Sequence, residues 1–173
     1  MTEKEPLEIE RKFLIRMPEE ARLVRESVRR IEISQVYLKT DAPGNSRRLR
    51  CSRCDGVETR YFTEKLRLTD RTRIERERVV TPEEWDGLLP EIDPGRRVIE
   101  KVRWCVPSGE HTLEIDVFPF WDDRAFCEIE LSAEDERFVL PDWIEVVREV
   151  TDDPRYTNSA LALAVPDETL PGA

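Results

Sequence analysis

The chain has 173 residues, of which 38% are charged, and its net charge at pH 7 is −10. This length favours a single domain with a sizeable core, and the acidic balance argues against a nucleic-acid scaffold, which would carry a basic excess. The sequence contains no apolar run of bilayer length and no signal-peptide pattern, so we expect a soluble cytoplasmic protein without a membrane partner.

The first half of the chain predicts several strands and two helices. The alternating stretch Glu8–Arg16 predicts a strand, and Pro18, with arginines near residue 30, predicts a helix over 17–30. Asp55-Gly56 is a strong hairpin-turn signal, and Thr81 followed by Pro82 predicts the start of a helix over 81–89. The other strands predicted here cover 33–40, 47–53, 57–68 and 73–80.

The second half predicts three more strands, over 96–106, 112–118 and 125–132. Short helices are predicted over 132–139 and over 158–164, the latter capped by Asn158, and the tail from 166 to 173 is predicted to be frayed. Short connections force neighbouring strands to be antiparallel. We therefore predict one α+β domain over residues 1–173, with about eight antiparallel strands and an ordered core from 8 to 163.

The cysteines form one suggestive motif, Cys51-x-x-Cys54. A zinc site would need two more suitably placed ligands, and a thioredoxin-like motif would need a βαβ context; neither is found. The sequence therefore predicts ordinary reduced cysteines, and it predicts that His111, the only histidine, is a solvated hairpin residue.

Charged residues recur at every second position of the predicted strands, with apolar residues between them. These sets are Glu8, Glu10 and Lys12; Arg48 and Arg50; Lys65 and Arg67; Arg73, Glu75 and Glu77; Lys101 and Arg103; Glu114 and Asp116; Glu128 and Glu130. A sheet with one face in water would explain each set alone. The sorting of acids and bases onto different strands favours instead a closed eight-stranded barrel whose charged face points inward, with room for a small ligand.

An interior that contains both arginines and carboxylates limits the kinds of ligand that could bind there. Buried unpaired charges are costly, so both the arginines and the carboxylates need partners. Arginine forks suit phosphate oxygens, and carboxylates without histidine or thiolate suit oxygen-loving cations such as Mg²⁺ or Mn²⁺. A metal-bound phosphate chain would satisfy both sets.

The opening Glu8-Ile9-Glu10-Arg11-Lys12 resembles the Glu-x-Glu-x-Lys signature of the CYTH superfamily, the triphosphate tunnel metalloenzymes. It is followed in order by QVYL, RLR, YFTEK, RIERE, EKVRW, LEIDVF, EIELSAEDE and EVTDDPRYTN. This order is similar to that of the short bacterial inorganic-triphosphatase-like members and covers roughly residues 8 to 163. The resemblance implies an eight-stranded antiparallel tunnel that binds triphosphate with a divalent metal.

The resemblance also implies roles for individual residues. The metal-coordinating residues would be Glu8, Glu10, Asp116, Glu128 and Glu130, and the triphosphate clamp would consist of Arg48, Arg50, Lys65, Lys101 and Arg103. Glu75, Glu77 and Glu114 are further candidates for metal or water contacts, with ion pairing to nearby arginines as the alternative. The sequence departs from the family pattern at Leu66, where many relatives have glycine, and at Arg155, where a late lysine is expected.

The implied activity is metal-dependent hydrolysis of triphosphates, with inorganic tripolyphosphate as the expected substrate. Lys12 is a candidate general base, and Tyr37 resembles a tyrosine that partners this lysine in short bacterial members; packing under the barrel lid is the alternative for Tyr37. An adenylate cyclase of the same type and a non-catalytic polyphosphate-binding module remain open, as do thiamine triphosphate and nucleotides as substrates. We expect a monomer or homodimer that does not bind nucleic acid.

Overall fold

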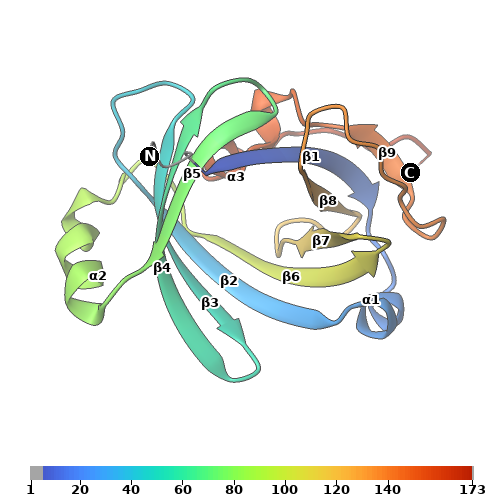
Figure 1. The fold of residues 1–173 in the computed structure, drawn as a ribbon, viewed down its shortest axis with the longest axis horizontal. Coiled ribbons are helices and arrows are strands. Elements are labelled where there is room, and N and C mark those ends of the chain that lie inside the picture. Colours follow the sequence, from blue (N-terminus) through green and yellow to red (C-terminus); the bar gives the residue numbers. More distant parts are fainter. Residues whose placement is uncertain (1–5, 173) are drawn as a thin grey trace.

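The computed structural model describes residues 6–172, and its central feature is a closed antiparallel barrel (Figure 1). The strand order is β5-β4-β3-β2-β6-β7-β8-β1, and β1 also pairs with β5 to close the ring. The strands are β1 (Leu7–Arg16), β2 (Arg29–Leu38), β3 (Ser46–Cys54), β4 (Val57–Arg67), β5 (Thr72–Val79), β6 (Ile99–Ser108), β7 (His111–Val117) and β8 (Arg124–Leu131). The predicted α+β fold with an eight-stranded antiparallel barrel is confirmed.

The closing seam between β1 and β5 is short. It contains three register pairs, Leu7 with Ile74, Glu8 with Arg73 and Ile9 with Thr72, whereas β1 and β8 are paired from Ile9 to Arg16. The barrel is therefore closed, but the pairing of β1 with β5 contains far fewer residue pairs than the pairing of β1 with β8.

The outward apolar faces of β6, β7, β8 and β1 form the main hydrophobic core. Leu23 of α1 (Glu20–Glu26) packs against this face, and so do Phe138, Trp143 and Ile144 from the connection that follows β8. The apolar residues that alternate with charges in the sequence therefore lie outside the barrel wall, beneath these covering segments.

Helix α2 (Pro82–Leu88), followed by the 3₁₀ turn η1 (Leu89–Glu91), stands on the outer flank of the barrel beside β4 and β5 (Figure 1). Its N-terminus carries a full capping box, in which the Thr81 hydroxyl accepts from the Glu84 amide and the Glu84 carboxylate accepts from the Thr81 amide. The predicted cap and first-turn proline of this helix are thus confirmed.

A second apolar cluster closes part of one barrel end. Inward residues near the strand ends, including Leu14, Ile99 and Phe126, meet the C-terminal segment there. That segment contains β9 (Val146–Glu149), the 3₁₀ turn η2 (Pro154–Tyr156) and α3 (Asn158–Leu161), and Figure 1 shows β9 beside β1. Tyr156 is 1% exposed and packs in this cluster.

Several local predictions were wrong, each because a tertiary contact overrides a local signal. Helix α1 is shorter than 17–30 because β2 begins at Arg29 and pairs with β6. The stretch 132–139 forms no helix; its acid Glu134 instead accepts from the hydroxyls of Thr69 in the β4–β5 turn and Thr72 at the start of β5.

The C-terminal end differs from expectation in three ways. Helix α3 is capped by Thr157 instead of Asn158, and β9 was not predicted. The tail predicted to fray packs instead, because Leu170 is 2% exposed within the second apolar cluster. Across residues 6–172, no helix has both the length and the apolar character needed to cross a membrane.

Candidate active site

Two adjacent chambers occupy the barrel. The large chamber has a volume of about 830 Å³ and the small chamber about 360 Å³. They share five lining residues, which we call the junction: Glu10, Lys12, Arg48, Lys65 and Asn158. The large chamber reaches the turns between β3 and β4 and between β6 and β7, and the small chamber reaches the opposite end, near Gly44 and Asp70.

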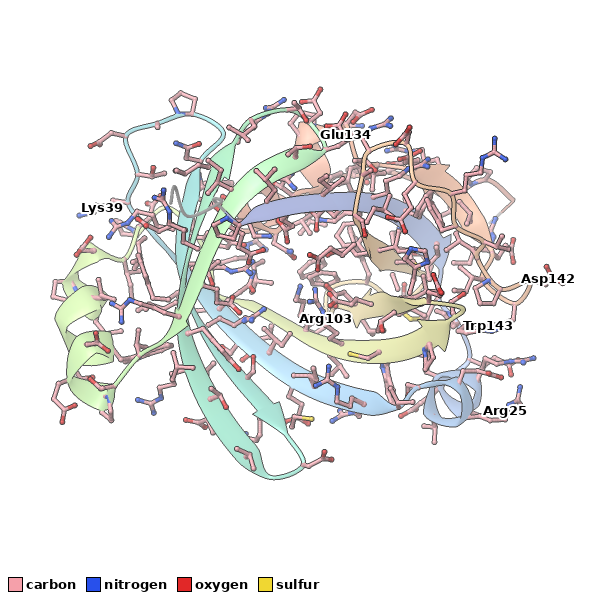
Figure 2. The ribbon with its side chains drawn as sticks, in the orientation of Figure 1. Arg25, Lys39, Arg103, Glu134, Asp142 and Trp143 are labelled. Atoms are coloured by element: carbon pink, nitrogen blue, oxygen red, sulfur yellow. The ribbon has the colours of Figure 1, made fainter. Side chains whose placement is uncertain are left out.

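The predicted phosphate clamp largely faces the large chamber. Arg48 and Arg50 on β3, Lys65 on β4 and Arg103 on β6 all line it, because each occupies an inward position of its strand. Figure 2 shows Arg103 within the ring of strands. The Nε groups of Arg48 and Arg50 are buried and have no hydrogen-bond partner in the described part of the chain.

The predicted acids Glu8, Glu10 and Glu130 also line the large chamber. The Lys65 ammonium lies 2.7 Å from a Glu8 oxygen, and Arg73 donates to Glu10 over 2.8 Å. Glu130 lies opposite Glu10 in the register of β1 and β8 and forms no hydrogen bond or ion pair within residues 6–172.

These acids crowd one another. Burial raises the pKa of Glu8 against the opposing charge of Lys65, and neighbouring Glu75 adds to the rise. Burial also raises the pKa of Glu130, with the charges of Glu8 and Glu10 contributing. A nearby cation would therefore stabilise the ionised form of these crowded carboxylates.

Asp116 and Lys101 occupy a different place from that implied by the resemblance. Neither lines either chamber. Asp116 is fully buried and accepts a forked pair of hydrogen bonds from Arg103, at 2.7 and 2.8 Å, and one from Lys101 at 2.5 Å. Burial alone would raise the pKa of Asp116, but Arg103 and Lys101 hold it below its usual value. In this arrangement Asp116 fixes the orientation of Arg103.

Glu128 lies between the cations of the wall. One of its oxygens is 3.2 Å from the Lys12 ammonium, and its other oxygen lies 3.6 Å from the Arg103 guanidinium. Although burial opposes ionisation, the charges of Lys12, Arg103 and Lys101 hold the pKa of Glu128 well below its usual range. Glu128 therefore remains a carboxylate that can hold Lys12 in place.

Lys12 is fixed at the junction by groups far away in the sequence. Its ammonium also donates to the backbone carbonyl of Tyr156 over 3.3 Å and lies 4.9 Å from the ring centre of Phe126. With 7% exposure, its head points into the junction with little freedom.

Tyr37 lines only the small chamber, which Lys12 also lines, so the two predicted catalytic residues share that chamber. Its hydroxyl accepts from the Gln35 amide over 2.8 Å. Burial raises the pKa of Tyr37, although the neighbouring Arg48 guanidinium opposes the rise. At neutral pH the tyrosine is consequently a hydrogen-bond donor.

As their side chains stand, no three His, Cys, Asp or Glu residues between 6 and 172 converge as a metal site. Glu8 is instead held by Lys65, and Glu10 by Arg73. The oxygen-only donors Glu8, Glu10 and Glu130 nevertheless fit a hard divalent cation, because they are crowded anions facing a cavity.

Sequence reasoning missed three residues of the site. Alternation predicts only that Arg73 shares a strand face with Glu75 and Glu77, yet its guanidinium also donates to Glu10. Asn158 was assigned to a helix cap, yet it lines the junction, where its side-chain oxygen has no partner among the described residues. Gln35 had one available signal, an amide at an inward position of β2, two residues before Tyr37.

Among residues 6–172, His111 and the four cysteines belong to no group of three or more possible metal ligands. His111 lines the large chamber at its outer end and contacts Glu136 at 2.7 Å. All four cysteines are free, as predicted.

An inorganic triphosphatase of Nitrosomonas europaea is 35% identical to this chain over 164 residues, which span 92% of this chain and 99% of that protein. The chain belongs to the CYTH superfamily. A second relative, an inorganic triphosphatase of Acetivibrio thermocellus, is 38% identical over 58% of this chain and 64% of its own length. The crystal structure of an inorganic triphosphatase shares 28% identity with a TM-score of 0.55, covering 92% of this chain and 96% of that one. No family model matches the chain.

Proposed function

We propose that this protein hydrolyses inorganic triphosphate to pyrophosphate and orthophosphate inside the barrel, with Mg²⁺ or Mn²⁺ as cofactor. The observation that carries the proposal is one cavity in which forked cations face crowded carboxylates. Two buried guanidinium N–H groups in its wall still lack an acceptor, and phosphate oxygens would satisfy them. The names of the relatives support the same substrate.

The substrate is held by the cations of the large chamber. Arg50 and Arg103 present forks that can each hold two phosphate oxygens. Arg48 and Lys65 line the junction as well as the large chamber, so they can hold the phosphate at the end of the chain. Positioning and charge neutralisation of this kind supply most of the catalysis in phosphoryl transfer.

The divalent cation would be held by Glu8, Glu10 and Glu130. When bound, it supplies positive charge that neutralises phosphate oxygens and polarises the scissile group. For the acids to reach it, Lys65 must release Glu8, and its ammonium then becomes available for phosphate. The proposal therefore couples metal binding to assembly of the clamp.

Lys12 and Tyr37 are the proposed catalytic residues. Water adds to a terminal phosphorus, the anhydride P–O bond breaks, and one proton of the water must leave as orthophosphate forms. Lys12, held by Glu128 and the Tyr156 carbonyl, points to the junction where this proton is lost. Tyr37 can donate a hydrogen bond there.

We also propose a cytoplasmic location. Four free cysteines support it, because thiols remain reduced in that compartment.

A phosphate-release assay tests the activity directly. The purified chain is given tripolyphosphate, thiamine triphosphate or ATP, with Mg²⁺, Mn²⁺ or EDTA. We expect fastest release from tripolyphosphate and none in EDTA. Glu10→Gln should raise the metal concentration needed for half-maximal rate while leaving the thermal unfolding of the metal-free protein nearly unchanged. Equal rates in EDTA and in metal would remove the cation from the mechanism.

A further inference from the structure

The two chambers have opposite charge balance. The lining of the large chamber contains nine acids (Glu8, Glu10, Glu75, Glu77, Glu110, Glu114, Glu128, Glu130 and Glu136) and six cations (Lys12, Arg29, Arg48, Arg50, Lys65 and Arg103). The lining of the small chamber contains three acids (Glu10, Asp70 and Asp152) and six cations (Lys12, Arg48, Lys65, Arg67, Arg73 and Arg96). An anion entering the large chamber needs accompanying cations, whereas one in the small chamber does not.

Three arginines belong to the small chamber alone. Arg67 and Arg73 come from the two sides of the β4–β5 turn, and Arg96 comes from the segment before β6. Arg96 is held in place by the Ser159 hydroxyl at 2.8 Å and by Asp93 at 3.2 Å. Its guanidinium therefore has a defined position beside the chamber.

Arg67 is positioned by the β2–β3 loop and by an ion pair with Asp70, which an anion bound in the small chamber must displace. The side-chain oxygen of Asn45 accepts from the Arg67 amide over 3.0 Å. Gly44, whose φ is +81°, lies so close that an added Cβ would be 3.0 Å from the Arg67 side chain. Glycine at this point allows the loop to lie on the arginine, which keeps Arg67 at the mouth of the small chamber.

The junction lies between this cationic chamber and the large chamber. Lys12, Arg48 and Lys65 face both chambers, and the buried Nε of Arg48 still lacks an acceptor in the described chain. A phosphate released at the junction thus meets, on the side of the small chamber, six cations against three acids.

We propose that the small chamber is a separate binding subsite for metal-free orthophosphate, lying on the far side of the junction from the triphosphate. Arg67 and Arg96 hold the anion, and the chamber opens at the barrel end opposite the large one. The proposed function enters only as the source of this orthophosphate, which would be a product of hydrolysis. The subsite itself is inferred from the charges and the lining residues of the small chamber.

The test measures binding of inorganic orthophosphate to the full chain in EDTA, by ³¹P NMR titration. We expect saturable binding, weakened about ten-fold by Arg67→Gln through loss of one charge-assisted contact. Arg96→Lys, which keeps the charge but loses the fork, should weaken binding less. Arg53→Gln is the matched control, because Arg53 is an exposed arginine of β3 that lines neither chamber.

A crossed variant separates the chambers. Arg50→Ala alters only the lining of the large chamber, so it should leave orthophosphate binding in EDTA intact while raising the KM for triphosphate. Added orthophosphate should inhibit turnover non-competitively, and Arg67→Gln should raise the inhibition constant about ten-fold.

Absence of orthophosphate binding in EDTA would overturn the inference. So would loss of binding in Arg50→Ala but not in Arg67→Gln, or purely competitive inhibition, because each places the anion in the large chamber. If the protein releases no phosphate from triphosphate yet Arg67→Gln still weakens orthophosphate binding, the subsite stands and the proposed function falls.

Discussion

At the scale of single residues, two inward arginines of the large chamber are held in contrasting ways. Arg103 is fixed by the forked contact with buried Asp116, so its orientation is set before any ligand arrives. Arg50 donates to Glu77 over 2.8 Å and lies 4.9 Å from the ring centre of Tyr61, but its Nε has no hydrogen-bond partner among residues 6–172. Arg103 is therefore preorganised, and Arg50 is the arginine that can turn toward a ligand.

Replacing Arg50 tests this difference. Arg50→Ala should raise the KM for triphosphate by a factor corresponding to about 1.5–3 kcal/mol, because a charge-assisted forked contact is lost. Arg50→Lys should recover only part of that loss, since lysine is a point charge. Steady-state kinetics of both variants decide the matter, and complete recovery in Arg50→Lys would show that charge alone matters.

Lys12 supports a sharper test at the same scale. If it accepts the proton of the attacking water, Lys12→Ala should abolish turnover with only a modest loss of triphosphate affinity. If it only clamps phosphate, affinity and turnover should fall together, and Lys12→Arg should keep much of both. Calorimetric affinity measured beside turnover separates the two, and an active, tightly binding Lys12→Arg protein excludes proton transfer by this residue.

The sequence predicted which residues face inward but not how deep each one lies. Alternation was enough to bring Glu8, Arg50 and Arg103 to one cavity, because strand geometry fixes the face of every second residue. Burial of Asp116 beneath Arg103 depends on the stagger of the strands around the barrel, which no local pattern specifies. The approach of Asn158 to Lys12 depends on how the C-terminal segment folds back.

At the scale of elements, the 3₁₀ turn η2 shows how short structure is held in place. Asp153 accepts from the Arg155 amide at 3.1 Å and from its guanidinium at 2.7 Å. These contacts lower the pKa of Asp153 to about 2, with the Arg155 hydrogen bond as the largest cause. The turn carries Tyr156, whose carbonyl holds Lys12, so its geometry bears on the junction.

The pH dependence of this turn follows from the sign of the shift. Because folding depresses the pKa of Asp153, its stabilisation is present above the unfolded value near 3.8 and is lost as pH falls toward 2. Asp153→Asn keeps a capping oxygen but removes the charge that pairs with Arg155, so it should lower the free energy of unfolding by on the order of 1 kcal/mol at pH 7, with the difference shrinking below pH 4. Denaturant unfolding across pH measures it.

Asp152→Asn is the control for that experiment. Asp152 is adjacent, but its side chain is 54% exposed and its contact with Arg71 is 3.4 Å long. An equal loss in both variants at pH 7 would mean that the turn does not depend on the Asp153 cap.

Elements with local signals were predicted best. The α2 start was predicted from Thr81 and Pro82 because capping is decided within one turn of chain. The stretch 132–139 has a helix-like composition, yet its acids contact distant residues: Glu134 accepts from Thr72 of β5, and Glu136 contacts His111. Contacts with distant residues override the helix propensity of this stretch, and they cannot be predicted from the local sequence.

At the scale of the whole molecule, the C-terminal tail is part of the barrel's stability. Leu170 is buried against the second apolar cluster, and Glu168 pairs with Arg148 at 3.0 Å. Arg148 belongs to β9, which pairs with β1. The end of the chain therefore helps to hold the strand that carries the Glu-x-Glu-x-Lys motif.

Removing the anchor of the tail should destabilise the entire fold. Leu170→Ala is expected to cost about 2–3 kcal/mol of unfolding free energy, through lost burial and the cavity left behind. Leu163→Ala is a suitable comparison, because Leu163 is 52% exposed and should change stability little. Similar unfolding midpoints for Leu170→Ala and the unaltered chain would mean that the tail is dispensable.

The short seam between β1 and β5 has a consequence for how the wall opens. Beyond its three register pairs, the seam is flanked by two backbone hydrogen bonds, Glu10 to Arg71 at 3.2 Å and Glu75 to Pro6 at 3.0 Å. Native proteins open first where few bonds must break together. The amide protons of this seam should accordingly exchange with deuterated solvent well before those between β1 and β8. A ligand held by Glu8 on β1 and by Glu75 or Lys65 on the neighbouring strands β5 and β4 should slow this exchange selectively, as mass spectrometry of peptic fragments would record.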